Sequence, residues 1–197
     1  MKRQKTDVLY EEISRHNPVT MRVHPGEVFQ VETILSTGSW LNSVEDVFSR
    51  HNEGFAANPV SGCIEVAGAQ PGDMLGIHVL DIQLASLGYT GWLACESPFP
   101  DWIRQRGWGT VSKTVRIEDG FILWGKDLKI PVHPMVGIMA TAPAKGCPST
   151  VDLGPYGGNM DCLLYTSTRI VTGLCLLISS YNTSVFCLFM PYSPSFK

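Results

Sequence analysis

Apolar and polar residues alternate over short stretches of this chain, and turn-forming residues separate these stretches. Between residues 27 and 33, polar Gln30 and Glu32 alternate with apolar Phe29 and Val31. A period of two residues is typical of a strand with one buried face. Strands are predicted on this basis over residues 27–33, 74–83, 113–118, 121–124 and 136–141.

Turn signals recur between these stretches. Pro71-Gly72-Asp73 marks one turn, and Glu118-Asp119-Gly120 is a hairpin signal between the apolar runs TVRI and FILW. Only residues 42–50 and the C-terminal tail have a pattern compatible with helix. Short strands separated by turns every ten or so residues favour an all-β or β-rich fold, a sandwich or barrel-like body with mostly antiparallel pairing.

Charge and length narrow the function classes. With 197 residues the chain can bury a substantial core as one domain or two small ones. A net charge of −3, with no cluster of Lys and Arg beyond the opening MKRQK, argues against a nucleic-acid partner. The MKRQK run also lacks the apolar segment of a signal peptide, so we expect a solvated terminus.

The cysteine spacing indicates thiols rather than a disulfide framework or a zinc knuckle. None of the six cysteines forms a C-x-x-C pair. Reduced thiols are typical of the cytoplasm, and we therefore predict a cytoplasmic protein. Their positions are Cys63, Cys95, Cys147, Cys162, Cys175 and Cys187.

The tail differs in composition from everything before it. All 18 acidic residues lie at or before Asp161, and residues 162–197 carry only Arg169 and Lys197 as charged groups. We consider three explanations: a truncated, frameshifted or chimeric reading frame, a divergent C-terminal element, and a membrane anchor over residues 170–190. The composition argues against the anchor, because SSYNTS would place six polar side chains near the bilayer midplane.

Three ordered sequence blocks resemble the acetamidase/formamidase family. They are NPVSGCIEVAGAQPGDMLGIHVLDI (58–82), PMVGIMATAP (134–143) and GPYGGNMD (154–161). The earlier HNPVTMRVHPGEVFQVET (16–33) fits the family's N-terminal strands more loosely, so the resemblance covers about residues 10–161. We therefore divide the chain into a β-rich family domain up to Asp161 and a non-matching apolar tail.

The resemblance implies both a fold and an activity. Members of this family have a β-sandwich core and hydrolyse the carbon-nitrogen bond of short linear amides such as formamide or acetamide, releasing ammonia and a carboxylate. The resemblance further implies a homo-oligomer and, in some members, a bound divalent metal, with zinc as the expected ion. A small amide is thus the expected partner, and a membrane is not.

The block GPYGGNMD supplies the candidate site. Gly157 and Gly158 can take positive φ and let backbone approach a small substrate, so their N–H groups are candidate oxyanion donors. Asn159 is a candidate side-chain donor to the same oxygen, and Asp161 a candidate to ligate a metal or orient a water. The alternative is an ordinary Gly-Gly turn in which Asn159 and Asp161 make local hydrogen bonds.

Amide hydrolysis also needs groups that activate water and protonate the leaving amine. Family members carry some of these in downstream segments, an Asp-x-His pair and a Gly-Asp-Gly-Glu run, and this chain has neither after Asp161. A second hypothesis is therefore a catalytically inactive fragment or a noncatalytic β-sandwich module.

Other side chains are further candidates for metal ligands or nucleophiles. Four histidines are possible zinc ligands. His78 shares a strand face with Leu80 and Ile82, so we expect it to be packed in the core. Cys147 is a candidate nucleophile without a supporting motif, and a loop thiol is the preferred interpretation. The four histidines are His24, His51, His78 and His133.

Overall fold

The computed structural model describes residues 1–36, 38–48, 58–92, 101, 105, 111–159, 175–180 and 186–189, with the backbone alone for 91, 92, 111 and the last two segments. The chain divides into two compact units. Unit 1 comprises Met1–Ser36, Phe55–Leu84 and His133–Lys197, and unit 2 comprises Thr37–Gly54 and Ala85–Val132.

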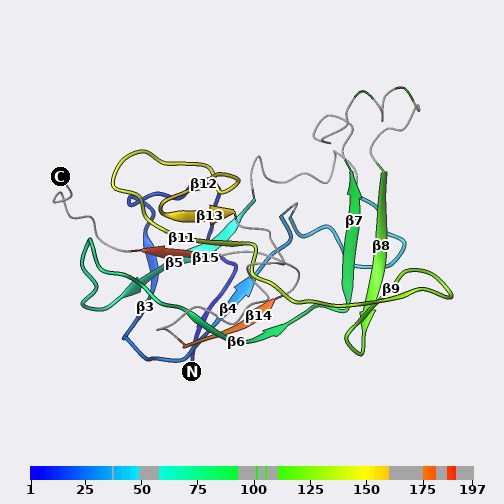
Figure 1. The fold of residues 1–197 in the computed structure, drawn as a ribbon, viewed down its shortest axis with the longest axis horizontal. Coiled ribbons are helices and arrows are strands. Elements are labelled where there is room, and N and C mark those ends of the chain that lie inside the picture. The colour runs from blue at the N-terminus through cyan, green and yellow to red at the C-terminus, as the bar shows by residue number, and fades with distance from the viewer. Residues whose placement is uncertain are drawn as a thin grey trace. The chain divides into compact units, whose positions relative to one another are not determined.

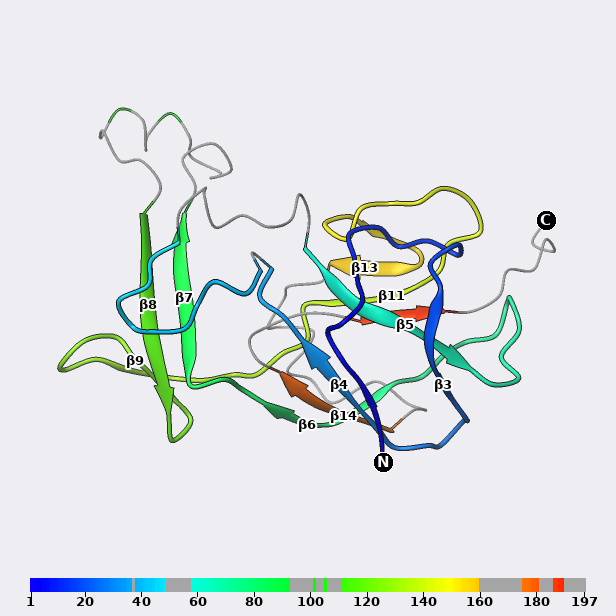
Figure 2. The same ribbon diagram turned by 180° about the vertical axis from the view of Figure 1, so that it is seen from behind.

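Unit 1 contains two sheets, which can be followed in Figure 1. The first has the strand order β1-β4-β14-β6. Its strands are β1 (Lys2–Gln4), β4 (Phe29–Thr33), β14 (Cys175–Ser180) and β6 (His78–Gln83). The second has the order β12-β13-β11-β15-β5-β2, and β3 also pairs with β5, as Figure 2 shows from behind. Its strands are β12 (Leu153–Gly154), β13 (Gly157–Asn159), β11 (Ile138–Thr141), β15 (Phe186–Phe189), β5 (Val60–Val66), β2 (Leu9–Tyr10) and β3 (Val19–Val23).

A hydrophobic core joins the two sheets of unit 1. On β4, Phe29 and Val31 are buried while Gln30 and Glu32 are half-buried, as the sequence alternation predicts. They pack with residues of β3 and β5 from the second sheet in one cluster, which contains Val23, Phe29, Val31, Ile64, Val66 and Ile77. The β-rich sandwich expected from the sequence is confirmed by this arrangement.

The second sheet of unit 1 is covered on both faces. Ile64 and Val66 of β5 join the core between the sheets, whereas Val60 and Cys63 belong to a second cluster with Ile13, Ile138 and Ala140. An irregularity in the pairing of β5 with β15 falls between Ser61 and Cys63, at Gly62. This extra residue shifts the alternation by one position, so Val60 and Cys63 face the same core although they are three positions apart.

Gly62 is needed at that irregularity. Its φ is +33°, and a Cβ at this position would collide with the side chains of Thr20 and Gln4. The Thr20 hydroxyl donates a hydrogen bond to Gln4 Oε1 at 2.6 Å, and Gln4 is only 3% exposed. The space beside the glycine is thus filled by a hydrogen-bonded polar pair.

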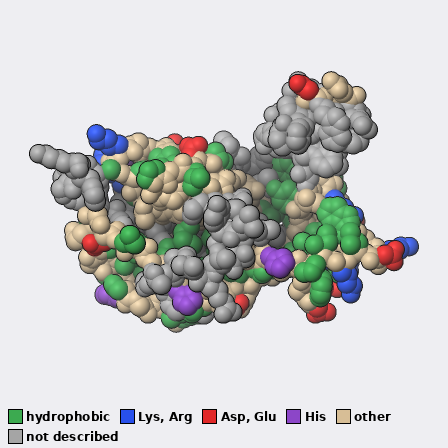
Figure 3. Space-filling model, in the orientation of Figure 1, with side chains coloured by type: hydrophobic (Ala, Val, Ile, Leu, Met, Phe, Trp, Pro, Cys, Tyr) green, Lys and Arg blue, Asp and Glu red, His purple; other side chains and the backbone are tan. Residues whose placement is uncertain are grey.

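Unit 2 is an antiparallel sheet of order β10-β9-β8-β7. Asp119 and Gly120 connect β8 to β9 with φ of 50° and 78°, which is the two-residue turn expected from Glu118-Asp119-Gly120. Figure 3 shows apolar side chains gathered on the surface of this unit, and Phe121, Trp124 and Ile130 are more than a third exposed. The strands are β7 (Leu87–Trp92), β8 (Val111–Glu118), β9 (Phe121–Leu123) and β10 (Lys129–Pro131).

Residues 42–50 have a pattern compatible with helix, but their described part, 42–48, forms a turn and irregular chain instead. The Asp46 carboxylate accepts hydrogen bonds from the backbone N–H groups of Asn42 (2.7 Å) and Ser43 (2.9 Å). Side-chain to backbone bonds of this kind stabilise turns in competition with helix. Residues 49 and 50 lie outside the described residues.

The same two bonds lower the pKa of Asp46, that from Asn42 most and that from Ser43 next. We expect its carboxyl to titrate below its ordinary value of 3.8. The carboxylate's stabilisation of the turn is then present above pH 3.8 and is lost as the pH falls through the lowered pKa. A side-chain NMR titration of Asp46 measures this, and Ser43→Ala, which keeps the backbone donor, should leave the midpoint low. A midpoint at or above the ordinary value would contradict the account.

The expectation of mostly antiparallel pairing holds in unit 2 but is wrong in unit 1. There β1 pairs with β4, and β3 with β5, in parallel. The tail strands β14 and β15 are also parallel to both of their neighbours. Hairpin signals report only antiparallel neighbours joined by short turns, so they could not reveal pairs between distant segments.

The tail, whose pattern was also compatible with helix, forms strands at its described residues, 175–180 and 186–189.

The expectation that His78 is packed in the core is wrong. His78 is exposed, because an irregularity in β6 breaks the alternation of its side chains and turns Val79 and Ile82 toward the core.

Within the described residues, no helix has the length and apolar character required to cross a bilayer.

Candidate functional site

The described part of the block GPYGGNMD, residues 154–159, belongs to a short hairpin at one end of the second sheet of unit 1. Gly154 ends β12, Pro155 and Tyr156 make the turn, and β13 follows as Gly157–Asn159. β13 pairs with β12 on one edge and with β11 on the other, both antiparallel. Asp161, the predicted metal or water ligand, lies outside the described residues.

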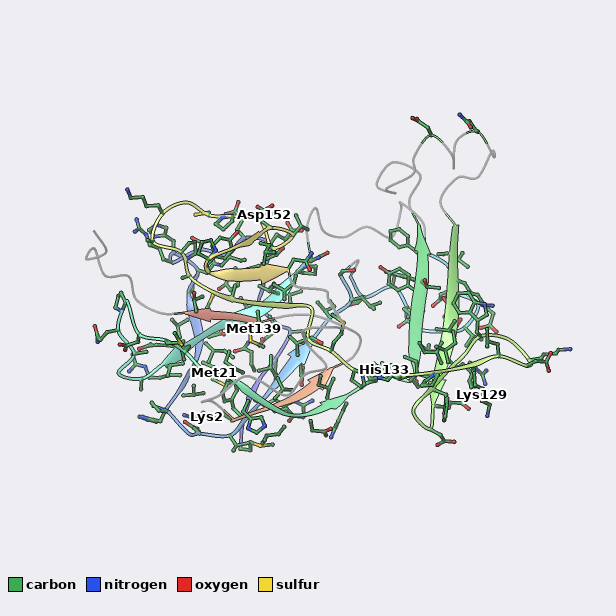
Figure 4. All side chains as sticks on the ribbon, in the orientation of Figure 1. Lys2, Met21, Lys129, His133, Met139 and Asp152 are labelled. Carbon is green, nitrogen blue, oxygen red and sulfur yellow. The ribbon has the colours of Figure 1, made fainter. Side chains whose placement is uncertain are left out.

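The two glycines allow β13 to lie tightly between its neighbours. Gly157 and Gly158 have φ of 93° and 116°, in the region that favours glycine. A Cβ on Gly157 would collide with the carbonyl oxygen of Met139, and one on Gly158 with that of Asp152. Figure 4 labels Met139 and Asp152 on the two sides of β13. The sequence predicted a close backbone approach at these two glycines. Among the described residues, neighbouring segments of the same chain make this approach.

Backbone hydrogen bonds hold the hairpin on both edges. Asn159 N–H donates to the carbonyl of Asp152 at 2.9 Å, and Thr141 N–H donates to that of Tyr156 at 2.8 Å. In a strand the N–H groups point toward the neighbouring strands, and β13 has a neighbouring strand on each of its edges. Oxyanion binding by Gly157 and Gly158 would compete with these neighbours, and this role stays a prediction.

Asp152 fixes the loop that leads into the hairpin. Its carboxylate accepts a hydrogen bond from Ser149 N–H at 3.0 Å, while its own N–H donates to the Ser149 carbonyl at 3.0 Å. This turn places the Asp152 carbonyl that receives Asn159 N–H. Asp152 is a positioning residue that our sequence reading missed, although Ser-x-x-Asp is a recognisable turn signature.

Asn159 carries the unusual feature of the site. Its Oδ1 atom is buried and has no hydrogen-bond partner, a property shared among the described side chains only with Thr33 Oγ1. Asn159 pairs with Ile138, which is 1% exposed, yet the Asn159 residue as a whole is half-buried. A buried acceptor without a donor is unfavourable, so this atom is an unusual feature of the hairpin.

Tyr156 flanks the same hairpin and packs against the cluster that contains Ile138 and Ala140. Burial raises the pKa of its hydroxyl above the ordinary 10.0, and the charge of Asp152 raises it further. The hydroxyl is therefore protonated at neutral pH and is available as a donor rather than as a base.

Cys147 lies in a loop near the N-terminal segment. Its Sγ is 3.2 Å from the hydroxyl of Ser14, which is itself buried, and the Cys147 residue is exposed. The Ile13 N–H donates to the Pro148 carbonyl at 2.8 Å and holds the two segments together. A thiol that meets a hydroxyl in a loop agrees with the loop interpretation rather than with a nucleophile paired with a base.

The described residues do not form a metal centre. No group of three His, Cys, Asp or Glu side chains able to hold an ion occurs in the part of the chain that the structure describes. His24, His78 and His133 are each exposed, and His51 lies outside the described residues, as does Asp161. A zinc site would need ligands from beyond this part, and we derive no chemical step through a metal.

Comparison with known proteins identifies relatives of this fold. The crystal structure of a predicted acetamidase/formamidase from the thermophile Thermoanaerobacter tengcongensis is 28% identical, with a TM-score of 0.73, and covers 84% of this chain and 54% of that one. An acetamidase from Bacillus halodurans is 23% identical, with a TM-score of 0.73, covering 83% of this chain and 54% of that one. A third, from Yersinia enterocolitica, is 12% identical, with a TM-score of 0.59, covering 82% of this chain and 52% of that one. The last two support the fold alone.

This chain thus spans about half the length of the solved structures it matches. No individually curated protein matches it. The sequence profile described as "Acetamidase/Formamidase family" matches residues 3–153, which include the blocks at 58–82 and 134–143 and end before Gly157. Because the profile covers most of the sequence and the sandwich agrees with it, the chain belongs to the acetamidase/formamidase family.

Proposed function

We propose that this chain provides part of the substrate site of a hydrolase that acts on short linear amides such as formamide or acetamide, with Asn159 as a substrate-contacting residue. Family membership over residues 3–153 supports the reaction class, cleavage of a non-peptide carbon-nitrogen bond to ammonia and a carboxylate. The observation that carries the assignment of the site is the buried, unpartnered Asn159 Oδ1 at the partly accessible end of β13.

The roles proposed for the neighbouring residues follow from their chemistry. Gly157 and Gly158 keep β13 close to β11 and β12, and so fix the backbone that carries Asn159. Asp161, two residues further on, is proposed as a ligand of a divalent ion, zinc being the expected one, or as the group that orients water. We also propose a homo-oligomeric assembly and a cytoplasmic location, and no nucleic-acid or membrane partner.

A second candidate is a catalytically inactive β-sandwich module. Two observations favour it: the described residues contain no group of three His, Cys, Asp or Glu side chains able to hold a metal ion, and the sequence holds no further acid after Asp161. Amide hydrolysis needs acid-base groups or a metal in addition to a substrate contact. On this alternative the chain retains the fold and the amide contact without turnover.

An ammonia-release assay on formamide and acetamide separates the two candidates. We expect the purified 197-residue chain to release no ammonia above background, with or without zinc. Replacing residues 162–197 with the C-terminal part of the Thermoanaerobacter tengcongensis relative is expected to produce activity. Asn159→Ala or Asp161→Ala should then lower that activity by on the order of a hundredfold, the scale for losing one catalytic group or donor.

Three results of this assay would each refute one assignment. Turnover by the unaltered chain would refute the inactive module. A folded chimera that hydrolyses amides equally well with Asn159→Ala would remove Asn159 from the proposed site, and one indifferent to Asp161→Ala would leave that residue with a structural role.

A further inference from the structure

We propose that one face of the sheet of unit 2 binds the same face of a second copy of this chain, with the strands of the two copies antiparallel. The surface is the side of the sheet that carries Ile122, and we call it the isoleucine face. The proposal goes beyond the amide site and the homo-oligomer proposed above, because it assigns a contact surface and an orientation to the two copies.

Two apolar rows make up the isoleucine face. Residues that pair directly in an antiparallel sheet point to the same side. Ile117, Ile122 and Ile130 pair with one another across β8, β9 and β10, and they form the first row.

The second row lies two residues further along the strands, on the same side. It contains Val115, Trp124 and Leu128, and the Trp124 N–H donates to the Leu128 carbonyl at 2.8 Å. The Lys113 Nζ lies 4.5 Å from the centroid of the Trp124 ring, as expected if β8 and β9 present both side chains on this face.

The opposite face of the sheet is covered within unit 2. The Tyr89 ring lies 5.1 Å from that of Trp40 and 5.8 Å from that of Phe48. The hydroxyl of Thr114, which pairs with Tyr89, donates to the carbonyl of Asp46. Residues 40–48 therefore cover this face.

The isoleucine face remains largely open. Val115 is buried, but Trp124 is 36% exposed, Ile130 37% and Leu128 52%. The open face is thus a continuous group of aliphatic and aromatic side chains. An exposed apolar patch of this kind on a folded protein marks an interaction surface.

Two charged residues indicate that the occupant is a second copy. Lys113 lies beyond the second row, and Asp119 lies beyond the first row, in the turn between β8 and β9. Two sheets that pack face to face about a twofold axis have parallel or antiparallel strands. Parallel strands would bring Lys113 against Lys113 and Asp119 against Asp119, whereas antiparallel strands bring each lysine opposite an aspartate of the other copy.

The antiparallel arrangement also matches the apolar rows. The level midway between Lys113 and Asp119 lies between the two rows, so a twofold rotation about it exchanges them. Ile122 of one copy then faces Trp124 of the other, and both rows are removed from water. Two rows on three strands make a small interface, so we expect reversible association with a Kd on the order of 10–100 µM.

Sedimentation velocity of the full 197-residue chain over a range of concentrations measures this association. We expect a monomer–dimer equilibrium. Trp124→Ser should weaken it at least about tenfold, and Leu128→Ser serves if that variant does not fold. Phe121→Ser is the matched control, because Phe121 is 39% exposed but pairs with Glu118 on the opposite face, and it should change the Kd by less than about twofold.

A charge exchange tests the orientation of the two copies. Lys113→Glu sets it opposite Asp119 of the other copy and should weaken the dimer about tenfold. Adding Asp119→Lys restores opposite charges at both contacts, and we expect the Kd to return to within about threefold of the wild-type value. Thermal melts confirm that each variant is folded.

The outcomes are independent of amide hydrolysis. A chain that stays monomeric at all concentrations, or a dimer that Trp124→Ser and Phe121→Ser weaken equally, would overturn the interface. A double charge variant that associates no better than Lys113→Glu would refute the antiparallel orientation. An ammonia-release assay that fails would remove the proposed amide site and leave this surface in place.

Discussion

Replacing Gly158 with alanine is expected to destabilise the fold by roughly 4 kcal/mol, enough to unfold much of a marginally stable protein. Gly158 has a φ of 116°, which side chains other than glycine's rarely adopt, and its Cβ would collide with the backbone carbonyl oxygen of Asp152. Backbone cannot rotate away as a flexible side chain would. Urea unfolding followed by circular dichroism measures the loss, and Gly157→Ala should behave alike because its Cβ meets the Met139 oxygen.

Gly146 provides the matched control. It also has positive φ, 79°, but a Cβ there would find no atom within 4 Å. Gly146→Ala should therefore cost only the conformational term, about 1 kcal/mol. Equal losses at Gly146 and Gly158 would show that the close approach of β12 does not explain the glycine in β13.

Truncation of Ile138 to alanine is expected to have the second-largest effect, a loss of about 2–5 kcal/mol in the free energy of unfolding. Ile138 is 1% exposed, belongs to the cluster with Ile13, Val60 and Cys63, and pairs directly with Asn159. The lost methyl groups leave a cavity that the surrounding strands can fill only in part. Denaturant unfolding gives the change, and an NMR spectrum shows whether the Asn159 signals move with it.

Ile130 is the control of the same residue type. It lies on β10 of unit 2 and is 37% exposed, so Ile130→Ala should cost less than about 1 kcal/mol. A loss at Ile138 no larger than that at Ile130 would contradict the buried core beneath the hairpin. A larger loss that leaves the Asn159 signals unchanged would separate packing in this cluster from the candidate site.

Both substitutions affect the proposed site through one strand. β13 carries Asn159, and its position depends on the glycines that fit it between β11 and β12 and on the core under Ile138. Changes at Gly157, Gly158 or Ile138 are thus expected to reduce amide binding indirectly.

The sequence by itself determined several of the local strands, among them β4, β8 and β9, and the place of the tight turn between β8 and β9. The alternation around Phe29 and Val31 is a property of adjacent residues, and it predicted β4 and its buried face. Asp119-Gly120 predicted the turn between β8 and β9, because positive φ at both residues is what such a turn needs. The three family blocks, too, were readable from residue order alone.

Only the tertiary structure decided what lies against each residue. It paired β1 with β4 and β3 with β5 in parallel, and it placed carbonyl oxygens of Met139 and Asp152 where side chains on Gly157 and Gly158 would have to go. It also buried Asn159 Oδ1 without a donor. Parallel pairing, close approach and burial depend on segments far apart in the chain, whereas propensity and periodicity report only on neighbours in sequence.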